Sequence, residues 1–348
     1  MAYVTATYTV KSPRMKEAAK AIARGQSVGN PNLFSPHETP EFLKRYAARA
    51  KADGNQVEVR FPARIFSRSG MNHILSVLMG GQMDIDIIES CKLNKVDFSH
   101  LKFPKPRYGI EGIRKVLEVY NRPLVGGIVK PKIGLNPERY ALLCREMAKG
   151  GADFIKEDEI LNDQAFCSMR KRIPAVVEAL QEFKVLYAPC ITADGSEVRR
   201  KARLAQKLGA NALHLNIHCS MGAYLDLRKD PKCDLPIFFQ KSGDKIWSTG
   251  QYSIDYNVIC QLANLAGCDF AHVGMYGGYM AETVDVLSKR ITALGNTIPS
   301  FSCGMTPELA GRCKDMFGHD VMVTSGGWIH SQPEGVAWAV KKMREAVD

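Results

Sequence analysis

A lysine and three carboxylates lie together at the end of an apolar segment, residues 150–159 (GGADFIKEDE). Strand alternation places Lys156 and Asp158 on one face, and Glu159 at the strand exit can turn in beside them. Two carboxylates suit a hard cation such as Mg²⁺, but a lysine ammonium has only donors and cannot be a metal ligand. Lys156 is therefore either a counter-ion for its acidic neighbours or a lysine that CO₂ converts to a carbamate, whose oxygens complete a three-carboxylate site.

A second apolar segment, residues 124–135 (LVGGIVKPKIGL), ends in two lysines separated by a proline. Proline fixes the local backbone, so Lys130 and Lys132 can be presented on the same side of a strand end. The motif KPKIGL, followed after one helix by GGADFIKEDE, resembles the RuBisCO superfamily, in which KPKxGL and GGxDFxKxDE strand ends occur consecutively. We therefore compare the rest of the chain with that superfamily.

The resemblance implies a role for each of these residues. Lys156 would be the carbamylated lysine, and Asp158 and Glu159 would be the other Mg²⁺ ligands. Lys130 and Lys132 would transfer protons and contact the substrate. The implied cofactors are Mg²⁺ and CO₂, the latter bound as the carbamate on Lys156.

Composition and charge limit the classes of protein. The chain has 348 residues, 45% hydrophobic and 24% charged, which is typical of a globular protein with one barrel-sized domain and a smaller one. The sequence has no apolar run of membrane-spanning length and no signal-peptide pattern, so we expect a cytoplasmic protein that does not cross a membrane. The 10 cysteines are scattered singly, as in reduced intracellular proteins. The net charge of +11 is spread without aromatic interleaving, which favours phosphorylated small molecules over nucleic acid as ligands.

From Arg122 onward the chain repeats an apolar strand followed by a helix pattern eight times. Strands are predicted at residues 124–130, 152–158, 185–192, 210–218, 235–241, 268–275, 297–303 and 320–325. Helix patterns between and after them include residues 137–149, 196–208, 256–266, 281–294, 307–317 and 335–346. This alternation predicts an α/β fold, a (β/α)₈ TIM barrel over residues 109–348, with chemistry at the carboxyl ends of the strands.

Residues 1–108 follow a different pattern and are predicted to form a smaller α+β domain. Strands are expected at 3–10, 56–61 and 83–89, and helices at 15–23, 40–50 and 71–79. The resemblance implies a ferredoxin-like domain that closes the barrel mouth of a partner subunit, with residues 24–30 reaching its substrate. It therefore also implies a homodimer or a multiple of dimers.

Glycines at two strand exits predict a phosphate site. Gly304 follows the seventh barrel strand, and Gly326 and Gly327 follow the eighth. Glycines leave backbone N–H groups open to an anion at these exits, although most glycine pairs are simply turns. By resemblance, these three glycines would hold one phosphate of the substrate.

Other strand ends carry polar side chains of less certain role. By resemblance, Lys241, His272 and Ser302 match residues that hold a second phosphate in bisphosphate-using enzymes, with His272 also a candidate catalytic residue. Lys241 replaces an arginine there, so bidentate phosphate binding is lost. His214 and His218 lie four residues apart on the predicted fourth strand and could supply an acid or base, or have a structural role.

Departures from the family motifs determine the expected function. Tyr279 occupies the place of the lysine that a mobile loop brings over CO₂ in the carboxylases, and Gln240 replaces their histidine. Gly81 does not supply the lysine used as base by the methionine-salvage enolase of this superfamily. We expect a Mg²⁺-dependent enzyme that enolises or isomerises a phosphorylated keto-sugar or related keto compound. The alternatives are a β-keto acid phosphate decarboxylase, a ribulose-bisphosphate carboxylase, and a non-catalytic binding protein.

Overall fold

The computed structural model describes residues 2–280 and 282–348, and its internal contacts divide the chain into two compact units. The first unit comprises Met1–Phe103 and Gly243–Leu262, and the second comprises Pro104–Ser242 and Ala263–Asp348. A segment within the predicted barrel region thus belongs, by its contacts, to the first unit. No helix in the described stretches has both the length and the apolar character needed to cross a lipid bilayer.

The first unit contains a five-stranded sheet of order β10-β4-β1-β3-β2. Its strands are β1 (Tyr3–Lys11), β2 (Arg49–Asp53), β3 (Gln56–Pro62), β4 (Ser90–Asp97) and β10 (Tyr252–Ile254). Its helices are α1 (Met15–Gly25), α2 (Pro40–Tyr46), α3 (Met71–Leu78) and α9 (Lys245–Ser248), with 3₁₀ turns η1 (Ala63–Phe66) and η2 (Gly81–Met83). The antiparallel order β4-β1-β3-β2 is that of a ferredoxin-like domain, to which β10 adds a parallel edge strand.

Two sequence predictions for this unit are wrong. The strand predicted at 83–89 is absent, because β4 begins at Ser90 and the preceding apolar residues form a 3₁₀ turn and a loop. The helix predicted at 40–50 ends at Tyr46, and the chain then enters β2. The hairpin between β2 and β3 turns at Gly54, whose φ of 55° is a conformation that favours glycine.

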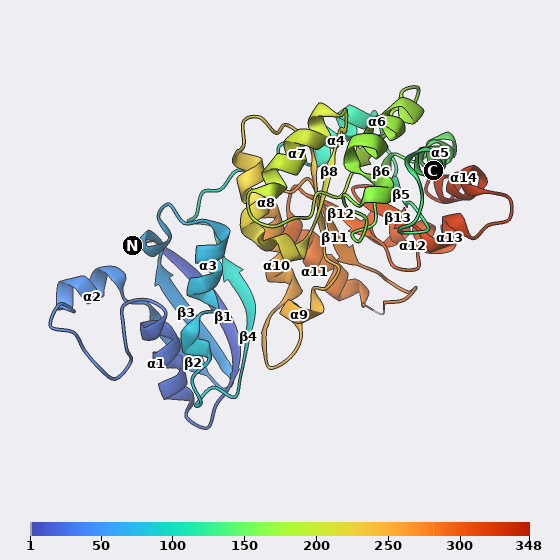
Figure 1. Cartoon of the computed structure of the whole chain (residues 1–348). Helices are drawn as coiled ribbons and strands as arrows, with labels where there is room; N and C mark the ends of the chain where they lie inside the picture. The colour runs from blue at the N-terminus through green and yellow to red at the C-terminus, as the bar shows by residue number, and fades with distance from the viewer. Residues whose placement is uncertain (1, 281) are drawn as a thin grey trace. The chain divides into compact units, whose positions relative to one another are not determined.

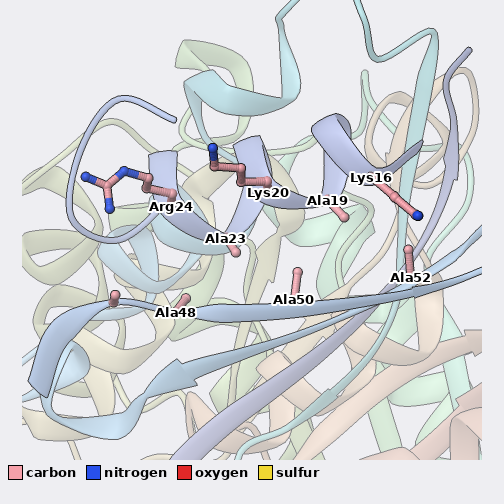
Figure 2. A pocket seen from close by; sticks show the side chains of 9 residues that line it. Lys16, Ala19, Lys20, Ala23, Arg24, Ala48, Ala50 and Ala52 are labelled. Atoms are coloured by element: carbon pink, nitrogen blue, oxygen red, sulfur yellow. The ribbon is translucent and has the colours of Figure 1, made fainter. Parts of the chain in front are cut away.

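A pocket of about 460 Å³ lies in the first unit between α1 and β2, as Figure 2 shows. Alanines form much of its lining, and Lys16, Lys20 and Arg24 project from successive turns of α1. Of these cations, Arg24 forms an ion pair with Glu38. The pocket is lined by no carboxylate among the described residues, so the predicted metal chemistry does not lie here.

The second unit is an eight-stranded parallel barrel (Figure 1). Its strands are β5 (Leu124–Ile128), β6 (Phe154–Lys156), β7 (Leu186–Ala188), β8 (Leu213–Asn216), β9 (Ile237–Gln240), β11 (Phe270–Gly274), β12 (Ile298–Phe301) and β13 (Met322–Ser325). The ladder runs β7-β6-β5-β13-β12-β11-β9-β8, and a parallel bridge between Cys190 and His214 joins its two ends. The predicted (β/α)₈ barrel with a smaller N-terminal domain is therefore confirmed.

Helices follow the barrel strands and surround them (Figure 1). They are α4 (Gly109–Leu117), α5 (Pro137–Lys149), α6 (Met169–Leu180), α7 (Glu197–Lys207), α8 (Ser220–Lys229), α11 (Val284–Leu294), α12 (Pro307–Phe317), α13 (Gly327–His330) and α14 (Val336–Glu345), with 3₁₀ turns η3 (Ala165–Cys167) and η4 (Ile217–Cys219). Helix α10 (Tyr256–Leu265) begins in the segment grouped with the first unit and ends in the second. The helix predicted at 281–294 begins at Val284, and residue 281 lies outside the described residues. Local signals fix several starts: the Asn136 side chain accepts from Arg139 N at 2.9 Å, one residue before the N-terminal Pro137 of α5.

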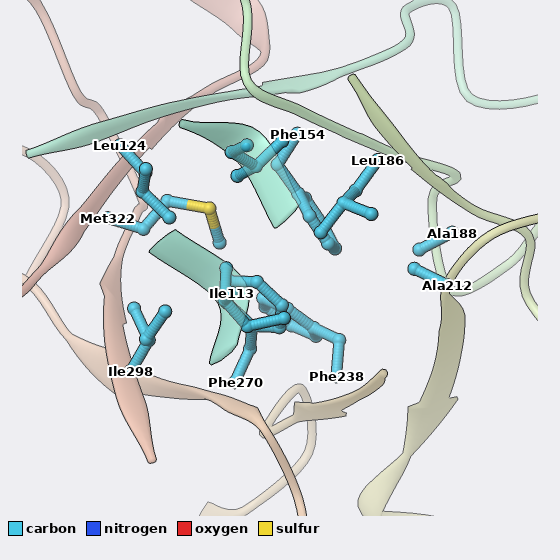
Figure 3. Packing of buried hydrophobic residues seen from close by; sticks show 11 residues of the cluster. Ile113, Leu124, Phe154, Leu186, Ala188, Ala212, Phe238, Phe270, Ile298 and Met322 are labelled. Atoms are coloured by element: carbon cyan, nitrogen blue, oxygen red, sulfur yellow. The ribbon is translucent and has the colours of Figure 1, made fainter. Parts of the chain in front are cut away.

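The barrel interior is filled by layers of side chains from alternate strands, several of which Figure 3 shows pointing toward one another. One apolar layer consists of Phe154, Ala212, Phe270 and Met322. Two residues further along the same strands, a buried polar layer consists of Lys156, His214, His272 and Thr324. The Phe238 ring lies between the two layers, since both Lys156 Nζ and the His214 ring lie 5.8 Å from its centroid. The floor of the barrel mouth is therefore polar.

Candidate active site

The exit of β6 divides its charged residues between two sides of the strand, as alternation predicts. Lys156 and Asp158 are 1% and 3% exposed. The Lys156 Nζ donates to the Glu157 carbonyl at 3.0 Å and lies 3.7 Å from Glu159 Oε2. The buried Lys156 amine thus lies close to Glu159 at the exit of β6.

Glu157 has a structural role on the other side of the strand. Its carboxylate forms an ion pair with Arg172 at 2.6 Å, and both side chains are fully buried. It also accepts hydrogen bonds from the Tyr187 hydroxyl and from Cys190 N. These partners account for the charge of Glu157, which leaves the other two carboxylates of the motif for chemistry.

Lys130 lies closest to the carboxylates among the predicted proton-transfer groups. Its Nζ donates to Asp158 Oδ2 at 2.5 Å, whereas the Lys132 Nζ is 4.0 Å from the same oxygen. The side chain of Lys130 is 24% exposed and that of Lys132 is 50% exposed. A Cβ on Gly326 would stand 3.1 Å from Lys130 Cε, so glycine at the exit of β13 leaves room for this lysine.

Burial controls the ionisation of Lys156. Removal from water lowers the pKa of its amine, and the negative charges of Glu159 and Asp158 only partly oppose that effect. Burial acts to raise the pKa of Glu159, but the Lys156 charge and a hydrogen bond with Ser242 hold it at about 2. The lowered pKa of Lys156 makes its neutral amine, the form that reacts with CO₂, easier to reach.

Gln240 is a site residue that the sequence reading did not assign. Its Nε2 donates to Glu159 Oε2 at 3.1 Å and to Ser242 Oγ at 2.8 Å. Gln240 ends β9, which is five strands from β6 along the ladder and three strands away through β7 and β8 in the closed barrel. The sequence indicated that Gln240 lies at a barrel strand end, where the carboxylases have a histidine. It did not indicate that Glu159, which is distant in sequence, is its hydrogen-bond partner.

His272 and Ser302 are brought together at the exits of β11 and β12. The Ser302 Oγ lies 2.6 Å from His272 Nε2, and both side chains are buried. Burial lowers the pKa of His272 to about 3, and the nearby charges of Lys241 and Lys156 add to the effect. His272 is therefore a neutral imidazole that can donate or accept but carries no charge, and Lys241 supplies the positive charge in this part of the mouth.

The glycine exits lie where the sequence analysis expected an anion site. Gly304 has a φ of 92°, and a Cβ there would stand 2.9 Å from Gly278 Cα in the loop after β11. That loop is held by Tyr279 N, which donates to Cys303 O at 3.0 Å. A Cβ on Gly327, the first residue of α13, would meet nothing within 4 Å. Gly304 thus allows the loop after β11 to pack closely at the exit of β12, whereas the space beside Gly327 at the exit of β13 is open.

His214 and His218 do not share a strand face, which corrects the sequence analysis. Strand β8 ends at Asn216, and His218 belongs to η4, where its N donates to Asn216 Oδ1 at 3.0 Å. The side chain of His214 is fully buried, whereas His218 is exposed beside a pocket of about 450 Å³ lined by the loops after β6, β7 and β8. Of these two histidines, His214 lies in the polar layer and His218 does not.

The donor set fits Mg²⁺ only if Lys156 becomes an anion. Within residues 2–280 and 282–348, no three His, Cys, Asp and Glu side chains gather as a metal site. Asp158 and Glu159 provide hard oxygen ligands, and the buried amine of Lys156 lies 3.7 Å from one of them. Conversion of that amine to a carbamate adds the missing carboxylate, so the residues present fit the implied cofactors.

Acid is expected to destabilise the protein through His272. Its pKa is about 3 in the folded chain and near 6.5 in an unfolded one, so the unfolded state binds more protons between these values. The free energy of unfolding should fall by up to about 1.4 kcal/mol per pH unit as the pH drops from about 6.5 toward 3. Urea unfolding of the parent and of His272→Gln at several pH values measures this slope. Equal slopes in the two proteins would assign the acid sensitivity to other groups.

Comparison with known proteins shows the family to which the chain is similar. The family model for the ribulose bisphosphate carboxylase large chain, catalytic domain, matches residues 109–348. A ribulose bisphosphate carboxylase-like protein of Archaeoglobus fulgidus is 29% identical over 390 aligned residues, which cover 99% of this chain and 87% of the relative. A 2,3-diketo-5-methylthiopentyl-1-phosphate enolase of Microcystis aeruginosa is 30% identical over 353 residues, which cover 95% of this chain and 89% of the relative.

The fold comparison covers both units. The crystal structure of a rubisco-like protein (MtnW) from Alicyclobacillus acidocaldarius aligns with a TM-score of 0.87 at 24% identity, covering 99% of this chain and 92% of that one. The similarity thus extends beyond the barrel to the N-terminal unit. From the matched catalytic domain and the near-complete coverage of its relatives, the chain belongs to the RuBisCO family and is a RuBisCO-like protein.

Proposed function

We propose that this protein is an enolising enzyme that removes the proton next to the carbonyl group of a phosphorylated keto compound. The observation that carries the proposal is the group formed by Lys130, Asp158, Lys156 and Glu159, with Lys130 Nζ 2.5 Å from Asp158 Oδ2 and Lys156 Nζ 3.7 Å from Glu159 Oε2. The similarity to a relative named as a 2,3-diketo-5-methylthiopentyl-1-phosphate enolase supports the same reaction class.

Asp158, Glu159 and the carbamate of Lys156 would hold Mg²⁺ in this proposal. When bound there, Mg²⁺ supplies a Lewis acid that stabilises the negative charge developing on the substrate oxygen. Gln240 orients Glu159 through its 3.1 Å hydrogen bond. Burial of Lys156 and Asp158 keeps water away from these charges and strengthens their electrostatic effect.

Lys130 is the proposed proton carrier, acting at Nζ. Its position beside Asp158 and above Gly326 directs its amine into the barrel mouth. Lys132 is more exposed and is proposed to contact the substrate. The neutral His272, hydrogen-bonded to Ser302, would orient a substrate hydroxyl without adding charge.

The phosphate of the substrate is proposed to bind at the exits of β12 and β13. Backbone N–H groups of Gly304, Gly326 and Gly327 would donate to its oxygens. Lys241 and Ser302 would contact the other end of the substrate, and Lys241 adds a single positive charge there. A lysine gives weaker, less directional binding of a second phosphate than an arginine does, which favours a substrate with one phosphate.

The decisive test is solvent exchange of the hydrogen next to the substrate carbonyl. The protein, preincubated with Mg²⁺ and bicarbonate, would be mixed in D₂O with a panel of phosphorylated ketones that includes 2,3-diketo-5-methylthiopentyl 1-phosphate. Loss of the α-hydrogen signal in proton NMR, abolished by EDTA, is the expected result. A protein that exchanges none of the panel, although it binds Mg²⁺, would contradict the proposal and favour a binding role. Release of CO₂ from a β-keto acid phosphate would instead favour the decarboxylase.

Carboxylation of ribulose 1,5-bisphosphate is expected to be negligible. The Tyr279 side chain is 86% exposed, and its phenol carries no positive charge to place over CO₂. Gln240 replaces the carboxylase histidine and is engaged by Glu159. Incorporation of labelled bicarbonate into acid-stable product measures the reaction. Turnover on the order of ~1 s⁻¹ would establish a true carboxylase.

We also propose that the active form is a homodimer or a multiple of dimers in which residues 24–30 of one subunit complete the site of its partner. The support is that proteins of this fold include one described as a dimeric archaeal Rubisco, with a TM-score of 0.89. Sedimentation at the assay concentration tests the proposal, and a fully active monomer would contradict it.

A further inference from the structure

A buried histidine with unsatisfied nitrogens lies in the polar layer of the barrel. The side chain of His214 is 0% exposed, and neither Nδ1 nor Nε2 has a hydrogen-bond partner within the described part of the chain. A buried polar group without a partner is costly, and most such groups in native proteins are paired. Both ring nitrogens are therefore able to bond to a polar group brought next to them.

The surroundings of His214 point to Lys156 as the source of that partner. The two side chains come from alternate barrel strands, β8 and β6, at the same level of the interior. Both lie against one aromatic ring, with Lys156 Nζ and the His214 ring centroid each 5.8 Å from the centroid of Phe238, which Figure 3 shows within the barrel core. The charge of Lys156 is also one of the causes that lower the pKa of His214, after burial itself.

Apolar side chains also lie beside the ring. The His214 ring meets Phe238 edge-on, with an interplanar angle of 82°, and β8 pairs with β9 so that His214 is the register partner of Phe238. Ala212 lies two residues earlier on β8 and belongs to the apolar layer below. The charged groups that act on the ring are Lys156 and Glu159, and the polar side chains that share its layer are Lys156, His272 and Thr324.

We propose that His214 is a positioning residue for the carbamate of Lys156, to which one imidazole N–H donates a hydrogen bond. This inference rests on the proposed function, because it requires that Lys156 reacts with CO₂. In the reaction, the neutral amine of Lys156 forms an N–C bond with CO₂, one C=O bond becomes a C–O⁻ bond, and a proton leaves the nitrogen for solvent. The new oxygens accept the N–H hydrogen bond that the Lys156 ammonium, which has only donors, cannot accept.

The proposal explains why a histidine suits this position. A neutral imidazole always keeps one N–H, so it stabilises the anionic carbamate without attracting the free carboxylates as a permanent cation would. A hydrogen bond to a charged acceptor is stronger than a neutral one, and burial strengthens it further. His214 would therefore favour the modified form of Lys156 and fix its oxygens for the metal.

The experiment measures carbamate formation directly rather than turnover. The full-length protein would be titrated with ¹³C-labelled bicarbonate at fixed pH with Mg²⁺, and the ¹³C NMR signal of the lysine carbamate would give the CO₂ concentration for half-modification. The variants are His214→Leu, which removes the donor at similar volume, and His214→Gln, which keeps an N–H donor. His218→Leu, an exposed histidine two residues beyond the end of β8, is the matched control.

His214→Leu is expected to need roughly 10- to 100-fold more CO₂ for half-modification, the effect of losing one hydrogen bond to a charged group. His214→Gln should lie within about 3-fold of the parent, a difference of under 1 kcal/mol, and His218→Leu should match it. If His214→Leu matches the parent, or if folded His214→Gln is as impaired as His214→Leu, the role of His214 is wrong while the carbamate stands. If the parent itself gives no carbamate signal, the proposed Mg²⁺ site fails first, and the inference fails with it.

Discussion

Replacement of Lys156 by alanine is expected to abolish detectable turnover and to weaken Mg²⁺ binding. The substitution removes the buried amine that is proposed to supply the third carboxylate beside Asp158 and Glu159. A Lewis acid contributes several kcal/mol of transition-state stabilisation, so its loss corresponds to a rate decrease of roughly 10³-fold or more. Calorimetric titration with Mg²⁺ and the α-hydrogen exchange assay measure the two effects.

Two controls separate this effect from a general loss of positive charge or of packing. Lys156→Met keeps the length of the side chain but cannot form a carbamate, and it should be as inactive as the alanine variant. Lys149→Ala removes an exposed lysine that pairs with Glu146 at the end of α5, and it should behave as the parent. Preincubation with CO₂ and Mg²⁺ should raise the activity of the parent and of Lys149→Ala only. Full activity and Mg²⁺ affinity in Lys156→Ala would exclude the carbamate.

The barrel could be predicted because its strands are buried on both sides. The segments that become β5 and β6 are almost continuously apolar, which distinguishes them from the amphipathic helices between them. Their polar residues therefore stand out at the strand ends, and alternation correctly separates Lys156 and Asp158 from Glu157. The local sequence predicts a site residue correctly where strand alternation alone decides which face of the strand its side chain occupies.

The strands of the first unit were harder to predict, because more than one segment of its sequence has a strand-like pattern. Residues 83–89 and 90–97 both contain alternating apolar residues, and the choice of the second as β4 depends on pairing with β1, which is distant in sequence. Strand β2 consists of alanine and charged residues with little intrinsic preference for a strand. Its pairing with β3 through the turn at Gly54 decides its conformation, and the Asp-Gly pair was the one local signal of it.

Partners across the barrel could not be predicted either. Gln240 was recognised as a replacement for a histidine, but its hydrogen bond to Glu159 joins residues 81 positions apart. The unpartnered ring of His214 likewise becomes visible only when the layer formed by β6 and β8 is assembled. Strand alternation shows which side a residue faces, whereas contacts across the interior depend on the stagger of the whole barrel.

Replacement of Lys130 by methionine is expected to slow exchange of the substrate α-hydrogen by roughly 10²–10⁴, the usual contribution of a positioned general base. Mg²⁺ binding should survive, because Lys130 is not an oxygen ligand. It should even become tighter, since the Lys130 ammonium, 2.5 Å from Asp158 Oδ2, competes with a metal cation for that oxygen. Exchange followed by NMR in D₂O and calorimetric Mg²⁺ titration give the two readouts on the same variant.

Lys132→Met is the matched comparison for Lys130. The Lys132 side chain is 50% exposed and its Nζ is 4.0 Å from Asp158 Oδ2, so its amine is better solvated and less closely held by the site. Its loss should mainly raise KM for the phosphorylated substrate, as expected for a residue that binds ground state and transition state alike. If Lys130→Met and Lys132→Met both exchange the α-hydrogen at the parent rate, neither lysine carries the proton. The polar layer would then supply the base, and His272 is the better placed of its histidines, because its Nε2 already contacts Ser302 at the barrel mouth.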